Sequence, residues 1–439
     1  MMSFRNKILL FGALAFAPFA PKAAAQEAWT LERCVAYALA NNISVRSAAL
    51  QVSDAEQSIT EAKDRFLPTL NASASESLNF GRGLTAQNTY ADRNTTSFQW
   101  GASLSLPLFQ GLSEYRQMDV AKANLRAMLL SHEAAKDDVS LNVMASYLQV
   151  LYAREVLQSA RTTLAHSSYE AERQKVLVEE GKVPEADLYD AQAQMAQDSL
   201  QVVTASNDVQ TALVSLANLL QMPMSDGFDV APLDETDPII PSPEAVYSSA
   251  LLINNGVMAS RQSVEVAQRR ISLAKTGYIP RLSFNAGIGS SYYTVGGMPR
   301  ETFSDQMRHN YSTYLGFSLS IPIFDGFSTR NSVRRAHLQR LQAELEVDRT
   351  RSQLFTSIQQ AYYQATGARS SYITSLDVLD KMRLSFAATQ EKYSLGRATP
   401  AEFEQAKSLL SRTEITSIQA HYEYLLRTRI LLFYQHGTL

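Results

Sequence analysis

Two nearly identical stretches decide the fold: Ser-Leu-Ser-Leu-Pro-Leu-Phe-Gln-Gly at residues 103–111 and Ser-Leu-Ser-Ile-Pro-Ile-Phe-Asp-Gly at residues 318–326. A second pair of stretches, 62–70 and 274–282, shares a Pro-containing pattern at almost the same separation along the chain. A third match pairs Gly181 with Gly396, at the same separation as the first. Three matches at a nearly constant separation predict that the chain contains the same structural unit twice.

Two repeats, a linker and a leader account for the domain organisation that we predict. The first repeat spans 26–222 and the second spans 244–436. The stretch 223–243 between them is rich in Pro and acidic residues, which is typical of a linker. Residues 1–25 combine a basic start, an apolar run and a final group of alanines. This is the pattern of a secretory signal peptide, so we expect the chain to be exported.

The charge balance argues against one class of partner. The chain has 40 Lys and Arg residues against 43 Asp and Glu residues, which gives a formal net charge of −3. The predicted signal peptide contains basic residues and no acid, so its removal makes the mature chain more acidic. Nothing in this balance favours nucleic acid as a partner, because such proteins usually present a basic surface.

Glycine and proline are scarce and unevenly distributed. The chain has 18 Gly and 14 Pro residues. Six long windows contain neither: 22–67, 112–180, 185–222, 327–366, 368–395 and 401–436. Because Gly and Pro cost about 1 and 3 kcal/mol in a helix interior, we predict long helices in these windows. Residues 31–66 and, more weakly, 244–279 also show the helical period.

Four short segments alternate between apolar and small polar residues instead. The alternation is clear along 98–108, 282–289 and 315–323 and weaker along 70–80, where Glu76 falls on the apolar parity. Alternation of this kind predicts strands. Each half should therefore contain a strand hairpin, at about 67–109 and 280–324, with polar loops at 81–96 and 294–310.

The composition of these strands favours a transmembrane β-barrel. Aromatic residues near the loop ends would form the girdle at the membrane surface: Trp100, Tyr292, Tyr293, Tyr311 and Tyr314. A soluble β-sandwich alternates in the same way, but here the polar parity contains Ser, Gly and Asn rather than Lys and Glu. Four strands are too few for a barrel, which needs about eight, and lipid does not tolerate open strand edges. Two or three copies of the chain must therefore share one barrel.

Sequence patterns of catalysis and metal binding are missing. None of the six histidines belongs to a His-x-x-x-His pair, and Cys34 is the only cysteine. The Gly-Arg-Gly at 81–83 lies in a polar loop without the helix that a phosphate site requires. The sequence also lacks a Gly-x-Ser-x-Gly nucleophile turn. We therefore expect no enzyme activity, no cofactor and no metal.

The order of these features, found twice, resembles the TolC family of outer-membrane efflux proteins. In each half a helical segment leads to a strand hairpin, then to one of the two quoted stretches, and then to a long helical hairpin. The turns of the helical hairpins are Glu-Gly-Lys-Val-Pro-Glu at 180–185 and Leu-Gly-Arg-Ala-Thr-Pro at 395–400. The resemblance covers residues 28–436.

The resemblance implies a mainly helical fold with a β-barrel part. It implies a homotrimer in the outer membrane of a Gram-negative bacterium, in which twelve strands form the barrel and twelve helices form a periplasmic tube. Such a protein is the passive exit duct of a tripartite efflux or type I secretion system. Its partners would be further copies of itself, outer-membrane lipid, a periplasmic adaptor and, through the adaptor, an inner-membrane transporter.

The resemblance also assigns roles to the two helical turns. Gly181, Lys182, Gly396 and Arg397 would form the periplasmic tips that the adaptor contacts. Ordinary turn chemistry explains the same residues, because Gly commonly follows a helix and Pro commonly begins one. Both interpretations stay open on the sequence alone.

Four residues match the closed periplasmic aperture of the family: the acids Asp187, Asp190 and Glu402 and the latch tyrosine Tyr393. Threefold symmetry would turn each acid into a ring that attracts cations. The helix dipole also favours acids in a first turn, which is a purely structural alternative. The sequence departs from the family at Gln405, where an acid is expected, and at Ala398, where a latch arginine is expected. Arg397 is one residue away from that arginine position. We expect charged links near Tyr393, Arg397, Asp187 and Asp190 to hold the inner helices together in the closed state.

One alternative function is a soluble periplasmic coiled-coil protein, such as an adaptor or a scaffold. Long exported helices occur in such proteins too. They do not need paired membrane-type strands, however, so the strand hairpins favour the duct.

Overall fold

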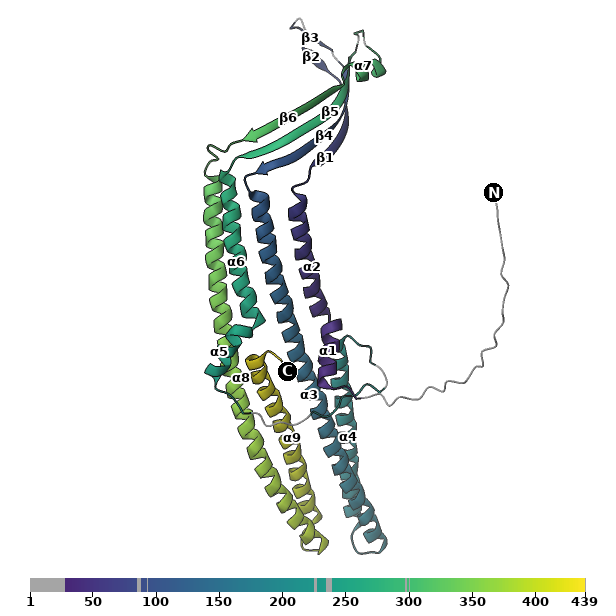
Figure 1. Ribbon diagram of the computed structural model, residues 1–439. Coiled ribbons are helices and arrows are strands. Elements are labelled where there is room, and N and C mark those ends of the chain that lie inside the picture. The colour runs from purple at the N-terminus through teal and green to yellow at the C-terminus, as the bar shows by residue number, and fades with distance from the viewer. Residues whose placement is uncertain are drawn as a thin grey trace, which may run out of the picture.

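The protein is a long, mainly helical molecule with a small sheet at one end (Figure 1). A computed structural model describes residues 28–84, 88–92, 94–224, 227–233, 239–296, 298–299 and 301–438. The predicted signal peptide at 1–25 lies outside the described residues, as do some positions of the predicted linker. Within the described part of the chain, every helix is too short or too polar to cross a lipid bilayer.

Two helices of 67 residues each run the length of the helical part: α3, Ser113–Glu179, and α8, Ser328–Ser394. At about 1.5 Å per residue each is roughly 100 Å long. The long helices predicted from the Gly- and Pro-free windows are confirmed, except that the described part of the window 22–67 contains two helices separated at Asn42. Gly367 separates the windows 327–366 and 368–395, but no helix ends there, because α8 continues through this residue. A single Gly costs only about 1 kcal/mol against Ala, and packing of the surrounding turns compensates for it.

Shorter helices accompany each long one in the same order in both halves (Figure 1). Beside α3 lie α2, Ile43–Asp64, near the sheet and α4, Glu185–Leu220, at the far end. Beside α8 lie α6, Asn255–Lys275, and α9, Pro400–His436. Both α6 and α9 also contact α3, so the two halves form one continuous wall.

Asparagine separates two pairs of consecutive helices. Helix α1, Leu31–Asn41, precedes α2, and α5, Pro243–Ile253, precedes α6. The side chain of Asn42 accepts a hydrogen bond from Ser44 N at 2.8 Å, and that of Asn254 accepts one from Val257 N at 3.0 Å. Each Asn therefore ends one helix and caps the next, because its side chain replaces a missing backbone acceptor.

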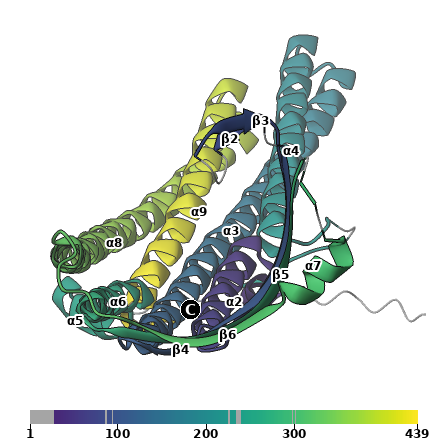
Figure 2. The ribbon, with the colours of Figure 1, turned by 90° about the horizontal axis from the view of Figure 1, so that it is seen from above.

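Four strands form one antiparallel sheet in the order β1-β4-β5-β6. Their bounds are Thr69–Asn79 for β1, Thr95–Gln110 for β4, Arg281–Val295 for β5 and Ser312–Ser320 for β6. Pairing of β4 with β5 joins the hairpins of the two halves and leaves β1 and β6 as the outer strands. Figure 2 shows that the sheet is bent into an open arc.

The loops between the strands contain structure that their polar composition did not predict. Strand β2, Arg82–Leu84, pairs with β3, Tyr90–Asp92, and helix α7, Phe303–His309, lies against β5. The ring of Phe303 packs on Phe98 and Tyr292 at centroid distances of 5.6 and 5.1 Å. These aromatic contacts attach α7 to the sheet.

The strand register gives the sheet one apolar face. Residues that lie opposite each other in an antiparallel pair share a face. Leu104 lies opposite Leu70 and Ala286, and Phe98 lies opposite Glu76 and Tyr292. Glu76 is therefore on the apolar face, as its parity predicts, and its side chain is exposed. Trp100 is two residues from Phe98 and lies on this face too.

Two of the predicted girdle residues lie on the opposite face of the sheet. Tyr293 pairs with Ser97, and Tyr314 pairs with Gly287. A Cβ atom on Gly287 would overlap the ring of Tyr314, so this ring covers the glycine. Successive residues of a strand point to opposite faces, so Tyr293 and Tyr314 cannot belong to a girdle on the apolar face. The register leaves Trp100 and Tyr292 as candidates on the apolar face, and Tyr311, which directly precedes β6, has no register partner that excludes it.

The last glycine of each quoted stretch makes a left-handed turn from the strands into a long helix. Gly111 has a φ of +62° and is followed by Leu112 at +66°, and Gly326 has a φ of +63° and is followed by Phe327 at +65°. Glycine adopts this conformation without the steric cost that a Cβ atom imposes. The repeated Gly therefore has a backbone function in both halves.

The two glycines give a matched test of this turn. We expect Gly326→Ala to destabilise the protein by about 1 kcal/mol, because only the left-handed backbone penalises alanine there. Gly111→Ala should cost about 2–3 kcal/mol, since its Cβ would also approach Ile279 Cβ at 3.0 Å and Ile279 O at 3.1 Å. At Gly326 nothing lies within 4 Å of this position. Thermal unfolding of both variants measures the difference, and equal losses would contradict the explanation.

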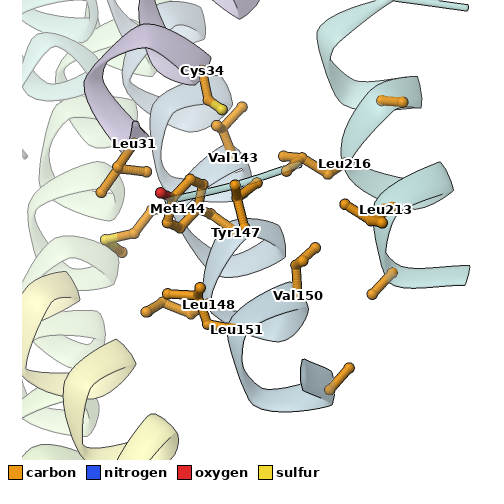
Figure 3. Packing of buried hydrophobic residues seen from close by; sticks show 14 of the residues in the cluster. Leu31, Cys34, Val143, Met144, Tyr147, Leu148, Val150, Leu151, Leu213 and Leu216 are labelled. Carbon is orange, nitrogen blue, oxygen red and sulfur yellow. The ribbon is translucent and has the colours of Figure 1, made fainter. Parts of the chain in front are cut away.

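The largest cluster of buried apolar side chains lies halfway along α3, where α1 and α4 pack against it (Figure 3). The hydroxyl oxygen of Tyr147 lies 2.6 Å from Ala231 O and 3.0 Å from Trp29 O, so it attaches the chain before α1 and the chain after α4. Cys34 is fully buried on α1. Burial raises the pKa of its thiol to about 12, which keeps the group protonated. Its place in α1 agrees with the helical period predicted for residues 31–66.

Candidate functional site

The two helical turns lie together at the end of the molecule farthest from the sheet (Figure 1). Gly181 and Gly396 both have a φ of +68°. In each turn the next residue donates a backbone hydrogen bond to a carbonyl five residues earlier, Lys182 to Leu177 and Arg397 to Lys392, at 2.8 Å. All four residues at the turns are exposed, and no atom lies within 4 Å of a Cβ position on either Gly. The turns are therefore available for contact.

Glu402 has a structural function at the start of α9. Its carboxylate accepts hydrogen bonds from Thr399 N at 2.8 Å and Thr399 Oγ1 at 3.0 Å, while Glu402 N donates to Thr399 Oγ1. This reciprocal arrangement is a capping box. The backbone hydrogen bond from Thr399 lowers the pKa of Glu402. The structural alternative for this acid thus has direct support.

The other predicted aperture residues do not meet Tyr393 within one protomer. Asp187 and Asp190 lie on the first turns of α4, and Arg397 lies in the second tip. Among the described residues, the side chains of these three form no hydrogen bond or ion pair with one another or with Tyr393. The charged links that we expect among them are therefore not formed within the described part of a single chain.

Tyr393 is instead the centre of a buried cluster between α3 and α8. Its hydroxyl donates to Glu170 Oε1 at 2.7 Å and accepts from Gln174 Nε2 at 2.6 Å. The guanidinium of Arg173 lies 4.9 Å above the ring, and Phe403 of α9 stacks on it at 4.7 Å. Burial, and then the hydrogen bond to Glu170, raise the pKa of Tyr393. The phenol thus stays neutral and joins the two helical hairpins.

A second buried polar cluster is centred on Asp198 of α4. Its Oδ2 atom accepts from Ser167 Oγ at 2.5 Å and from Lys407 Nζ at 3.1 Å, and its Oδ1 atom accepts from Gln194 Nε2 at 2.8 Å. Lys407 Nζ also donates to Glu404 Oε2 at 3.3 Å. Only 7% of the Lys407 side chain and 11% of the Asp198 side chain is exposed. This ion pair connects α9 of the second half with α4 of the first.

Glu404 carries an electrostatic cost within this cluster. Burial is the largest cause of its raised pKa, and the nearby Asp198 and Glu170 add to it. Lys407 opposes the shift by its charge and its hydrogen bond. One lysine therefore stabilises two carboxylates. The charges of Glu170 and Asp198 both act on Glu404, so the two clusters are electrostatically connected. We refer to the residues of both clusters together as the hairpin clamp: Tyr393, Glu170, Gln174, Asp198, Lys407 and Glu404.

Most of the hairpin clamp was not predicted from the sequence, although a signal for part of it exists. Asp198 lies seven residues before Ala205 on the buried face of α4, and Lys407 lies four residues after the buried Phe403 on α9. A charged residue on a helical stripe of small and apolar residues is unusual, because burial of a charge requires a partner. The partner could not be identified in this way, because Asp198 and Lys407 are 209 residues apart.

The arrangement is suited to holding helices together. Its ionised groups are paired with one another, while Gln174 Oε1 is buried without a hydrogen-bond partner among the described residues. Within the same residues, no group of three or more His, Cys, Asp or Glu side chains is arranged to hold a metal ion. Tyr393 lies three residues before Gly396, so the hairpin clamp begins within one helical turn of the second tip. A contact at the tips is therefore close to the side chains that hold the four helices together.

Comparison with known proteins identifies the family. The sequence profile of the outer membrane efflux protein family matches residues 35–220 and again residues 246–432. TolC of Vibrio cholerae is 23% identical over 392 residues, which cover 88% of this chain and 86% of TolC. The alkaline protease secretion protein AprF of Pseudomonas aeruginosa is 24% identical over 353 residues, 78% of this chain and 70% of AprF.

A solved structure gives the same result for the fold. The CmeC outer membrane channel of Campylobacter jejuni superimposes with a TM-score of 0.73 at 18% sequence identity, over 93% of this chain and 85% of CmeC. The family profile matches most of the chain, in two stretches that each contain one strand hairpin and one helical hairpin. The chain belongs to the outer membrane efflux protein family, whose members resemble TolC.

Proposed function

We propose that the protein is the outer-membrane exit duct of a tripartite efflux or type I secretion system. The observation that carries this proposal is the four-stranded sheet with two open outer strands, at one end of a curved helical wall. A sheet in lipid must close on itself, so several chains have to complete it. The names of the relatives, an efflux family and a protease secretion protein, support the same function.

Three copies would supply twelve strands and a closed tube of helices. In this assembly β6 of one chain would pair with β1 of the next. Leu338, Leu341 and Leu345 of α8 support such a lateral contact, because they are exposed in the single chain and lie at a spacing of three and four residues on one helix face. The internal repeat would then give the trimer six similar units around one axis.

The outer membrane is the location that these features support. Relatives carry outer-membrane names, and the apolar face of the sheet, with Trp100, Tyr292 and Tyr311 near its loop end, fits a lipid-facing band. The helical part would extend into the periplasm. A soluble periplasmic adaptor, the alternative, does not need this apolar sheet face.

The exposed glycine turns would be the contact sites for a periplasmic adaptor, which links the duct to an inner-membrane transporter. Gly181, Lys182, Gly396 and Arg397 are accessible there. The hairpin clamp would hold the closed form of the tube, since it fixes the hairpin α3–α4 against the hairpin α8–α9. An adaptor that binds a dilated form more tightly would shift this equilibrium toward the open duct.

Planar-bilayer recordings test both the duct and its closure. The unmodified protein is expected to form pores with a small resting conductance. Tyr393→Phe should raise that conductance severalfold, because it removes the hydroxyl and leaves Glu170 and Gln174 buried without it. The matched control is Tyr169→Phe, which changes a tyrosine that is 73% exposed on α3 and should leave the conductance unchanged.

The outcomes separate the two parts of this proposal. Failure of the unmodified protein to form any pore would contradict the duct. If the unmodified protein and Tyr393→Phe form pores with the same resting conductance, the proposed role of the hairpin clamp is wrong. The proposal that the protein is an exit duct would not be affected by that result. The same recordings test the predicted aperture acids. If Asp187→Asn with Asp190→Asn leaves the ion selectivity unchanged, these two residues do not form part of the aperture.

A further inference from the structure

A groove with two unpaired arginines lies just below the sheet, far from the hairpin clamp. It has a volume of 360 Å³ and opens between α3, α6 and α8. Arg270 of α6 and Arg335 of α8 line it, together with Gln117 of α3. Both arginine side chains are exposed, and in the described part of the chain neither has a hydrogen bond or an ion pair. We refer to Arg270 and Arg335 as the arginine belt.

The position of the groove assigns the belt to the inner face of the helical wall. Helix α6 lies between α3 and α8 and contacts both. In a curved wall, the two neighbours of a middle helix converge over that helix only on the concave side. The groove is lined by α3 and α8 across α6, so it lies on the concave side, which becomes the lumen when the wall closes into a tube.

Helix geometry agrees with the position of Arg270 on the groove side of α6. On α6, Val266 packs against Val120 and Ala123 of α3, and Arg270 is four residues later, close to the same side of the helix. Arg261 is nine residues before Arg270, which at about 100° per residue places it on the opposite side of α6. Arg261 therefore lies on the side of α6 that faces away from the groove.

The local charge balance makes the belt basic. In 261–281 and 328–343, Glu265 is the only acidic residue, and it is already paired with Arg269 at 2.7 Å. The facing part of α3, residues 113–127, has two acids against three basic residues, and one of the acids, Asp119, is paired with Arg116. In the alignment of the two repeats, Ser58 of the first half corresponds to Arg270, and Val120 corresponds to Arg335. Only the second half therefore contributes these charges. The belt is a local basic site on a chain whose formal net charge is −3.

We propose that the arginine belt makes the upper lumen selective for anionic cargo, namely solutes that carry carboxylate or phosphate groups. This inference rests on the proposed exit duct, in which three copies would place six belt arginines around one lumen. Rings of Arg and Lys produce anion selectivity in pores, and a guanidinium binds carboxylate and phosphate through paired hydrogen bonds. Because the side chains are hydrated, binding is weak enough for cargo to leave again.

Reversal potentials in planar bilayers under a KCl gradient test the belt. Arg270→Glu with Arg335→Glu exchanges six positive for six negative charges in a trimer. We expect the permeability ratio of K⁺ to Cl⁻ to rise by about threefold or more at low ionic strength, where charges are weakly screened. Inorganic phosphate at millimolar concentration should reduce the chloride current of the unmodified pore and should not affect the variant.

The control exchanges a charge on the side of α6 that faces away from the groove. Arg261→Glu should leave the permeability ratio unchanged, because Arg261 does not line the groove. Should the Glu variant of the belt not assemble, Arg270→Gln with Arg335→Gln gives the same test with a smaller shift.

The results distinguish this inference from the proposed function. A pore whose selectivity is the same before and after the belt substitutions overturns the arginine belt and leaves the duct unaffected. An equal shift in the control variant overturns it too, because the effect would then come from the total charge. Absence of any pore in the unmodified protein overturns the proposed duct, and the inference that rests on it.

Discussion

Replacement of Leu338, Leu341 and Leu345 by Asp is expected to leave the protein as a monomer that does not insert into the outer membrane. The three side chains are 61%, 47% and 68% exposed in the single chain. Burial of a leucine contributes about 1.5–3 kcal/mol, and an unpaired buried carboxylate costs more than that contribution. At each of the three interfaces of a trimer, three such substitutions should cost more free energy than the association of the chains provides.

The mass of the detergent-solubilised protein, measured by light scattering, checks this result. The expected mass is that of three chains for the unmodified protein and of one chain for the triple variant. Leu341→Asp and Gln342→Asp form a matched pair, since both residues are exposed neighbours on α8 but only Leu341 belongs to the apolar stripe. A trimer that persists in the triple variant would exclude this face of α8 from the interface.

Lys407→Met is expected to lower the free energy of unfolding by about 3 kcal/mol or more, the usual cost of removing one partner from a buried ion pair. Asp198 would lose its cationic partner, 3.1 Å away, and Glu404 would lose its own at 3.3 Å. Because the pair joins α9 to α4, we also expect the resting conductance to rise. Chemical denaturation and bilayer recordings measure the two effects.

The pH dependence of this variant provides an independent readout. The pKa of Glu404 is already raised in the folded protein, and removal of Lys407 should raise it further. A raised pKa means that the folded state favours the protonated acid, so stability is highest below the unfolded pKa and falls as pH rises through the folded value. The loss caused by Lys407→Met should therefore be smaller near pH 5 than near pH 8.

A double substitution and a surface substitution are the controls. Asp198→Asn with Lys407→Met removes both charges and should recover part of the stability, because no unpaired ion is left between them. Lys381→Met breaks an exposed pair with Asp377 on α8 and should change stability by less than about 1 kcal/mol. Equal losses for Lys407→Met and Lys381→Met would show that the buried pair is not important.

The sequence predicted the helices and strands well because their signals are local. Gly and Pro are excluded from α3 and nearly excluded from α8, and the alternation along 98–108 predicts the strand that becomes β4. The structure in the loops, β2, β3 and α7, was missed, because polar composition is common to loops and to short exposed elements. Tyr293 and Tyr314 were grouped with the girdle because closeness to a loop end does not specify a face of the sheet.

The candidate site was predicted only in part, for a similar reason. The positions of Gly181, Gly396 and Tyr393 follow from the repeat and the family resemblance. The partners of Tyr393 do not follow from them: the sequence suggested Asp187, Asp190 and Arg397, whereas within one chain the hydroxyl contacts Glu170 and Gln174. Those partners lie on α3, in the other half of the chain, where no local pattern connects them to Tyr393.

By itself, the sequence determined the helices, the strands, the repeated unit and the turns of this protein, since periodicity, Gly and Pro act over a few residues. The tertiary structure decided which hairpin packs on which. It brought Asp198 together with Lys407 and put Arg270 and Arg335 in one groove. These contacts join different helices, and their geometry depends on how whole hairpins pack, which no local pattern specifies.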